Sequence, residues 1–196
     1  MLLTTRRPGT GKTVTIVEAI RQILDANPKA RILACAPSNS AADIIAERLT
    51  MLSADELFRF YAPSRFKNQT PDTLRDYTCT TEFGHFTAPP VPTLKRYRVI
   101  VSTCVSASFA HGVGMPRGHF THIFVDEAGQ ATEPEVMIGI KTMADNDTNV
   151  VLSGDPKQLG PIIRSAVARE LGLEKSYLER IMERESHSPD EWEGVT

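Results

Sequence analysis

Short apolar runs alternate along this chain with longer stretches in which apolar residues recur at helical spacing. The runs predict strands at residues 2–4, 31–36, 97–102, 123–126 and 150–153. The run at 31–36 is apolar at nearly every position, which is typical of a strand buried on both faces. Because strands that alternate with helices are joined by crossovers, this order predicts an α/β domain with a mostly parallel sheet flanked by helices.

The helical stretches have recognisable ends. Apolar spacing predicts a helix over 12–26, and the Asn-Pro pair at 27–28 stops it. The serines and asparagine at 38–40 offer N-caps for a second helix. Thr-Glu-Pro-Glu at 132–135 is a capping-box pattern that opens a third. A final helix is predicted over 176–185.

The stretch at 62–93 is the least regular part of the chain. Its prolines, at positions 63, 71, 89, 90 and 92, predict a loop-rich insertion. We expect one domain over residues 1–184 that contains this insertion. Residues 185–196, which combine a Ser-Pro pair with acidic residues, are expected to form a flexible tail.

Composition indicates a folded protein without an overall basic surface. The chain has 196 residues, of which 41% are hydrophobic and 23% charged, values typical of a globular domain rather than a disordered one. The net charge of −2 gives no global attraction for nucleic acid, so any RNA contact must come from local groups. Basic residues cluster in two places, each either a solvated surface or an RNA path: Arg59, Arg65 and Lys67, and Lys95, Arg96 and Arg98.

The cysteines argue against a disulfide framework or a zinc site. Cys35, Cys79 and Cys104 lie far apart, with no Cys-x-x-Cys spacing. A reducing interior is the simpler compartment, so the cytoplasm is expected, and Cys35 and Cys104 lie in apolar runs typical of core positions. No apolar run reaches membrane-spanning length and the N-terminal apolar stretch is too short for a signal peptide, so no membrane partner is expected.

A glycine loop between the first strand and the first helix is the first candidate site. Backbone N–H groups of such a loop, and the helix N-terminus behind it, bind phosphate oxygens. Lys12 is expected to reach the β- and γ-phosphates of ATP, and Thr13 to ligate Mg²⁺. Arg6 stands where the consensus has its first glycine, so a chance loop is the alternative for this motif alone. The expected nucleotide-binding residues here are Pro8, Gly9, Thr10, Gly11, Lys12 and Thr13.

Two further candidate sites follow predicted strands. Asp126 and Glu127 end an apolar strand, where Asp126 can hold Mg²⁺ and its waters while Glu127 orients and deprotonates the attacking water. Gln158, in the Gly/Asp/Pro-rich stretch 153–161, has a neutral amide that can contact the γ-phosphate. Lys12, Glu127 and Gln158 are thus the candidate catalytic residues. The structural alternatives are an ordinary capped strand end and an ordinary turn.

Taken together, four segments resemble motifs I, Ia, II and III of superfamily 1 RNA helicases. They are residues 8–13, 36–43, 126–135 and 154–161, in the family's order and spacing. The nonsense-mediated-decay helicases are one branch of that superfamily. The form Ala-Pro-Ser-Asn-Ser-Ala-Ala-Asp at 36–43 is closer to the Armitage and Moloney-leukaemia-virus-10-type branch, which is linked to RNA silencing. The resemblance extends from Pro8 to about Glu183.

The resemblance implies a RecA-like ATP-binding helicase domain that uses ATP and Mg²⁺. It also implies RNA as a partner, gripped by its backbone without regard to base sequence, and a link to RNA-silencing or mRNA-decay proteins. The positions that such helicases place along the RNA correspond here to Ser38, Asn39, Ser102 and Thr103. Plain N-capping is the alternative role for residues 38–40.

The chain also departs from the family pattern. Nothing after Pro161 is long enough to be the second RecA-like domain, which supplies arginines to the ATP site, and no adenine-recognising stretch precedes the loop. The leading hypothesis is therefore the first motor domain of an enzyme for ATP-dependent RNA unwinding or RNP remodelling. A non-catalytic nucleotide- or RNA-binding module is the alternative. An unrelated kinase or GTPase fits poorly, because the guanine-specific Asn-Lys-x-Asp motif is absent.

Overall fold

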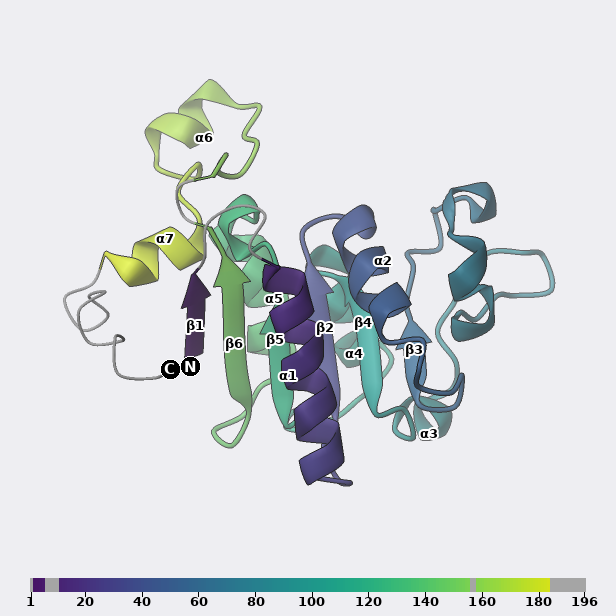
Figure 1. Ribbon diagram of the computed structural model, residues 1–196. Coiled ribbons are helices and arrows are strands. Elements are labelled where there is room, and N and C mark those ends of the chain that lie inside the picture. The colour runs from purple at the N-terminus through teal and green to yellow at the C-terminus, as the bar shows by residue number, and fades with distance from the viewer. Residues whose placement is uncertain (1, 6–10, 156–157, 184–196) are drawn as a thin grey trace.

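A six-stranded, fully parallel sheet forms the centre of the molecule (Figure 1). The computed structural model describes residues 2–5, 11–155 and 158–183. The strand order across the sheet is β1-β6-β5-β2-β4-β3. The strands are β1 (Leu2–Thr5), β2 (Ile32–Ala36), β3 (Leu57–Arg59), β4 (Val99–Thr103), β5 (His122–Val125) and β6 (Asn149–Gly154). The predicted parallel α/β architecture is confirmed, and β3 is the strand that the sequence pattern missed.

Helices cover both faces of this sheet, as Figure 1 shows. Side chains of α1 and α2 form one apolar core with β2 and β4. Side chains of α3, α4, α5 and α7 contribute to a second core on the other face. The helices are α1 (Lys12–Ala26), α2 (Asn39–Arg48), α3 (Val91–Leu94), α4 (Ser108–Gly112), α5 (Glu133–Met143), α6 (Ala166–Glu170) and α7 (Tyr177–Met182). None of the helices in the described part of the chain is long and apolar enough to cross a membrane.

Strand β2 shows why its composition is apolar throughout. Ile32 and Ala34 pack into the core under α1 and α2, whereas Leu33 and Cys35 pack into the core on the opposite face. Burial raises the pKa of the Cys35 thiol to about 12, and burial also raises the pKa of Cys104. Both thiols are therefore protonated core residues, as the sequence predicted.

The segment 62–93 contains little regular structure. It carries the 3₁₀ helices η1 (Lys67–Gln69) and η2 (Asp72–Tyr77), one isolated bridge between Thr80 and Phe86, and the start of α3. Leu74 and Phe86 are buried and tie the segment to the rest of the domain. The predicted tail at 185–196 lies outside the described residues.

Helix α5 begins with the capping box that its sequence predicted. The Thr132 hydroxyl accepts a hydrogen bond from the Glu135 N–H at 3.4 Å, and the Glu135 carboxylate accepts one from the Thr132 N–H at 2.9 Å. Two backbone donors that the first helical turn leaves unpaired are thereby satisfied.

We predict that Thr132→Ala lowers the free energy of unfolding by about 1 kcal/mol, because it removes the cap acceptor. Urea unfolding followed by circular dichroism measures this change. Thr132→Ser keeps the oxygen and should recover most of the loss, and Thr93→Ala, at an exposed position, is the matched control. A Thr132→Ala protein as stable as the parent would contradict the capping role.

Candidate functional site

Every sequence motif follows a strand at the same edge of the sheet. Because the strands are all parallel, their carboxyl ends lie together, at the end to which the arrows point in Figure 1. Ser38 follows β2, Asp126 follows β5 and Asp155 follows β6, while Lys12 begins the helix after β1. The carboxyl edge of a parallel sheet is where ligands bind in open α/β folds.

A hydrogen bond joins the first two motifs. The Thr13 hydroxyl donates to Asp126 Oδ2 at 2.7 Å, across 113 positions of sequence. Asp126 is 1% exposed, and its Oδ1 accepts the Glu127 N–H at 3.0 Å. Its own N–H donates to the Cys35 carbonyl at 2.9 Å, which holds the carboxylate against the neighbouring strand. The structure therefore presents a hydroxyl and a carboxylate oxygen side by side.

The glycine loop enters α1 through Gly11. Gly11 is the helix N-cap and has φ of 79°, a left-handed conformation that glycine adopts without steric cost. Lys12 follows directly and is buried at the start of the helix. The helix N-terminus and the Lys12 charge together favour an anion at this point. The predicted loop residues Pro8, Gly9 and Thr10 lie outside the described residues.

Glu127 has an unusual backbone. Its φ of 52° makes it the non-glycine residue with a positive φ in the described part of the chain. Burial raises the pKa of its carboxyl group; the Lys12 charge lowers that pKa, and the Asp126 and Asp155 charges raise it. Residues from all three predicted motifs thus lie close enough to influence one carboxylate. Backbone strain of this kind costs on the order of 1 kcal/mol and is concentrated at functional sites.

Two glycines allow the second and third motifs to meet. A Cβ at Gly154 would lie 2.8 Å from the Gly129 nitrogen, and a Cβ at Gly129 would lie 2.7 Å from the Asp155 carbonyl oxygen. The 3₁₀ helix η4 (Ala128–Gln130) therefore packs backbone to backbone against the end of β6. This contact brings Asp155 next to the Asp126–Glu127 pair.

Gln158 lies in a pocket between three motifs. The cavity has a volume of about 630 Å³, and its lining includes Ser38, Gln130, Thr132, Gln158 and Pro161. Gln130, which the sequence analysis did not single out, donates to the Glu127 carboxylate at 3.5 Å. Its sequence signal was its place within the segment 126–135, three residues after Glu127. The pocket links the predicted nucleotide residues with the start of α2.

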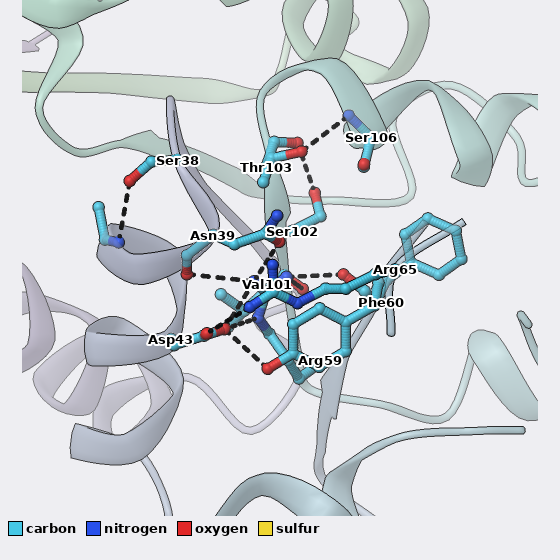
Figure 2. A network of polar contacts seen from close by, with 12 residues as sticks. Ser38, Asn39, Asp43, Arg59, Phe60, Arg65, Val101, Ser102, Thr103 and Ser106 are labelled. Carbon is cyan, nitrogen blue, oxygen red and sulfur yellow. Dashed lines mark hydrogen bonds and ion pairs between the residues drawn. The ribbon is translucent and has the colours of Figure 1, made fainter. Parts of the chain in front are cut away.

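The side chains of Ser38 and Asn39 both form hydrogen bonds at the N-terminus of α2. The exposed Ser38 hydroxyl accepts the Ala41 N–H at 3.1 Å, which is the N-capping role foreseen as the alternative. The Asn39 amide oxygen accepts a hydrogen bond from Arg59 at 3.1 Å (Figure 2). Both residues remain partly or fully accessible at the carboxyl edge of the sheet.

Comparison with known proteins identifies the family. A model of the AAA domain family matches residues 2–87 and 90–166. The chain belongs to this family. Membership implies the use of a nucleotide together with a metal ion.

Three relatives define the branch of the family. The chain is 45% identical over 187 residues to the Homo sapiens RNA helicase Mov10l1, covering 94% of this chain and 15% of that protein. It is 48% identical over 179 residues to the Danio rerio putative helicase mov-10-B.1, covering 89% and 18%. It is 36% identical over 202 residues to the Drosophila melanogaster probable RNA helicase armi, covering 93% and 17%. The resemblance to the Armitage and Moloney-leukaemia-virus-10-type branch is confirmed, and the chain spans 15–18% of these relatives' length.

A solved structure supports the fold alone. The crystal structure of T4 UvsW matches with a TM-score of 0.51 at 14% identity, covering 80% of this chain and 27% of that chain. The RecA-like α/β fold expected of an AAA domain in this branch is confirmed. The described residues contain no cluster of three or more His, Cys, Asp or Glu side chains that could hold a metal ion. A nucleotide-bound Mg²⁺ needs only one or two carboxylates, with phosphates and water completing its shell.

The expectation of RNA contact by the Ser102 side chain is wrong for this structure. Ser102 is fully buried, and its hydroxyl donates to the Thr103 carbonyl at 3.1 Å. Thr103 is 9% exposed, and its hydroxyl accepts the Ser106 N–H at 3.2 Å (Figure 2). Both side chains are enclosed because β4 is covered on both faces, so consecutive strand residues, which point to opposite faces, each point into a core. The hydroxyl of Thr103 is therefore also engaged within the fold.

The two readings of Arg59, solvated surface or RNA path, are both wrong. Arg59 is fully buried and forms an ion pair with Asp43. Arg98, from the second basic cluster, is partly buried, and it donates to the Leu24 carbonyl at 2.6 Å. In both cases a donor-rich side chain satisfies backbone or carboxylate acceptors inside the domain.

We predict that Gly154→Ala destabilises the domain by about 1–3 kcal/mol, because the methyl group would overlap backbone atoms that cannot move aside. Gly112→Ala is the matched control, since a Cβ there meets nothing within 4 Å, and it should change stability by less than about 0.5 kcal/mol. Urea unfolding measures both variants. Equal stability of the two would show that the motif II and III backbones are not in close contact.

A second prediction concerns Glu127 and pH. Because its pKa is raised in the folded state, ionised Glu127 opposes folding at neutral pH. Glu127→Gln should therefore be more stable than the parent at pH 7. As pH falls through the raised pKa and below the ordinary glutamate value, the carboxyl is protonated in both states and the gain should vanish. Unfolding midpoints measured between acid and neutral pH test this, and a gain independent of pH would refute it.

Proposed function

We propose that this chain is the ATP-binding first motor domain of an RNA helicase that unwinds RNA or remodels RNA–protein complexes. The hydrogen bond from Thr13 to Asp126 is the observation that carries the proposal, because it joins the hydroxyl of motif I to the carboxylate of motif II. The relatives' names support RNA as the substrate. Since the chain spans 15–18% of those relatives, the activity of the whole enzyme belongs to this proposal.

The nucleotide site is assembled from three motifs. Lys12 and the N-terminus of α1 bind the β- and γ-phosphates of ATP. Thr13 and Asp126 fit Mg²⁺, because they offer hard oxygen donors 2.7 Å apart and one buried negative charge. When bound, the ion neutralises charge that develops on the phosphates.

Glu127 is the proposed base. Its backbone strain and its hydrogen bond from Gln130 fix the carboxylate at the mouth of the site. The raised pKa makes the carboxylate a better proton acceptor than a solvated glutamate, while the Lys12 charge opposes that rise. Glu127 thus orients a water molecule and accepts its proton. Gln158 lies in the adjoining pocket and contacts the γ-phosphate through its neutral amide.

The RNA path is proposed along the start of α2. Ser38 is exposed and the Asn39 amide is partly exposed, and both suit contact with phosphate and sugar rather than bases. RNA-silencing or mRNA-decay proteins are proposed partners, on the resemblance of residues 36–43 to the Armitage and Moloney-leukaemia-virus-10-type branch. The thiols of Cys35, Cys79 and Cys104 are free, which supports the reducing cytoplasm as the compartment.

The test is nucleotide binding by the Lys12→Ala variant. Losing the lysine removes a charge-assisted contact worth about 1.5–3 kcal/mol, so Mg²⁺–ATP affinity should fall about tenfold or more. Isothermal titration calorimetry measures it, with Lys29→Ala, an exposed lysine beyond the end of α1, as the matched control. Equal affinity of the Lys12 variant and the parent would reject the ATP site.

The Glu127→Gln variant separates catalysis from binding. It keeps the shape of the side chain and removes the base, so ATP should still bind while RNA-stimulated hydrolysis falls. The assay includes a second motor domain from a relative, because that domain supplies the arginines of the ATP site. Under these conditions, a parent chain that binds ATP and RNA but hydrolyses no faster than Glu127→Gln would favour the non-catalytic binding module instead.

A further inference from the structure

A buried guanidinium lies directly behind the start of α2 (Figure 2). Arg59, at the end of β3, is fully buried. Its Nε donates to Asp43 at 2.8 Å, and its Nη1 donates to the carbonyls of Phe60 at 2.6 Å and Val101 at 3.5 Å. Its Nη2 lies 2.7 Å from Asp43 and donates to the Asn39 amide oxygen at 3.1 Å. These contacts engage all three guanidinium nitrogens.

The charge of Arg59 is compensated by Asp43, which projects from the buried side of α2. Asp43 is 5% exposed, and its Oδ1 also accepts the Tyr61 hydroxyl at 2.8 Å. Arg65 lies 3.7 Å from Oδ2, and both arginines stack over the Tyr61 ring. The pair is therefore enclosed by partners that hold it in one arrangement.

This arrangement fixes the Asn39 carboxamide. A guanidinium has only N–H donors, so the amide oxygen of Asn39 must face Arg59. The amide nitrogen, which carries two N–H donors, is then directed away from Arg59. Among the described residues no acceptor pairs with that nitrogen, and Asn39 is partly exposed beside Ser38. An N–H pair presented in this way matches an anionic phosphate oxygen.

Stability alone does not explain why Arg59 and Asp43 form a buried ion pair at this place. Replacing a buried ion pair by apolar side chains of similar volume is often neutral or stabilising, so its stabilising value is small. Orienting a neighbouring polar group is a task that apolar residues cannot perform.

We propose that Arg59 is a positioning residue for RNA binding, which holds the Asn39 carboxamide so that its N–H groups face the phosphate backbone of the RNA. The inference rests on the proposed function, which places RNA at the start of α2. It adds that the affinity of this contact is set by a residue that never touches the RNA. Asp43 and Tyr61 serve the same end by keeping the Arg59 charge paired.

The first experiment compares two Asn39 variants by fluorescence anisotropy with a labelled oligouridine. Asn39→Ala removes the donors and should weaken binding about tenfold. Asn39→Asp keeps the hydrogen bond from Arg59 but replaces the donors by a negative charge, so it should weaken binding still further. The thermal unfolding midpoint of Asn39→Asp should nevertheless equal or exceed that of the parent. If Asn39 had only a structural role, a variant that is as stable as the parent would also bind RNA like the parent.

The second experiment removes Arg59 and Asp43 together, so that neither member of this buried pair is left without the other. A variant carrying Arg59→Met, Asp43→Leu and Tyr61→Phe should bind the oligouridine about threefold or more weakly. Adding Asn39→Ala to this variant should cause no loss beyond that of Asn39→Ala alone, because both changes remove one contact.

The outcomes separate the two proposals. If Asn39→Ala weakens binding but the network variant binds like the parent, or if the two losses add, the positioning role of Arg59 is wrong while RNA contact at α2 stands. If Asn39→Ala binds like the parent, RNA contact by Asn39 is wrong and the positioning role fails with it. If the network variant does not fold, the unfolding midpoints of the Asn39 variants decide. A midpoint of Asn39→Asp as low as that of Asn39→Ala would show that Arg59 does not hold the Asn39 side chain, and the positioning role would be wrong.

Discussion

The parallel pairing of β2 with both β4 and β5 is the constraint on which the rest of the site depends. Parallel strands require long crossovers, so each motif sits on a different connection, far from the others in sequence. The further parallel pairs β1–β6, β5–β6 and β3–β4 extend this alignment, so all six carboxyl ends lie at one edge. Thr13 and Asp126 can therefore meet at 2.7 Å, although 113 positions of sequence separate them.

A close backbone contact between η4 and the end of β6 brings the second and third motifs together. Gly129 and Gly154 allow η4 to lie against the end of β6, and a side chain at either position would separate them. Glu127 begins that 3₁₀ helix in a left-handed conformation, which the hydrogen bonds of its neighbours hold in place. The raised pKa of Glu127 follows from this crowding, because burial and two neighbouring carboxylates disfavour its charged form.

The opposite end of the site is built around a buried charge instead. Arg59 and Asp43 occupy positions that an ordinary core would fill with apolar side chains, and the domain retains both by satisfying their polar atoms with one another, with Tyr61 and with backbone carbonyls. The ion pair also joins the end of β3 to α2, so the place where the segment 62–93 leaves the sheet is tied to the proposed RNA path.

Local patterns in the sequence determined much of this protein. Apolar runs located five strands, helical spacing set α1 at 12–26 as observed, and the Thr132–Glu135 pattern formed its capping box, because each depends only on neighbouring residues. The motif spacing also indicated residues that meet at the carboxyl edge of the sheet, among them Thr13 and Asp126. Only the tertiary structure decided the strand order, the burial of Ser102 and the place of Arg59. A charged residue in the apolar run at 57–61, and Asp43 on the buried side of α2, were the available signals. Neither could be interpreted alone, because a buried charge is defined by a partner that the fold, and not the local sequence, brings to it.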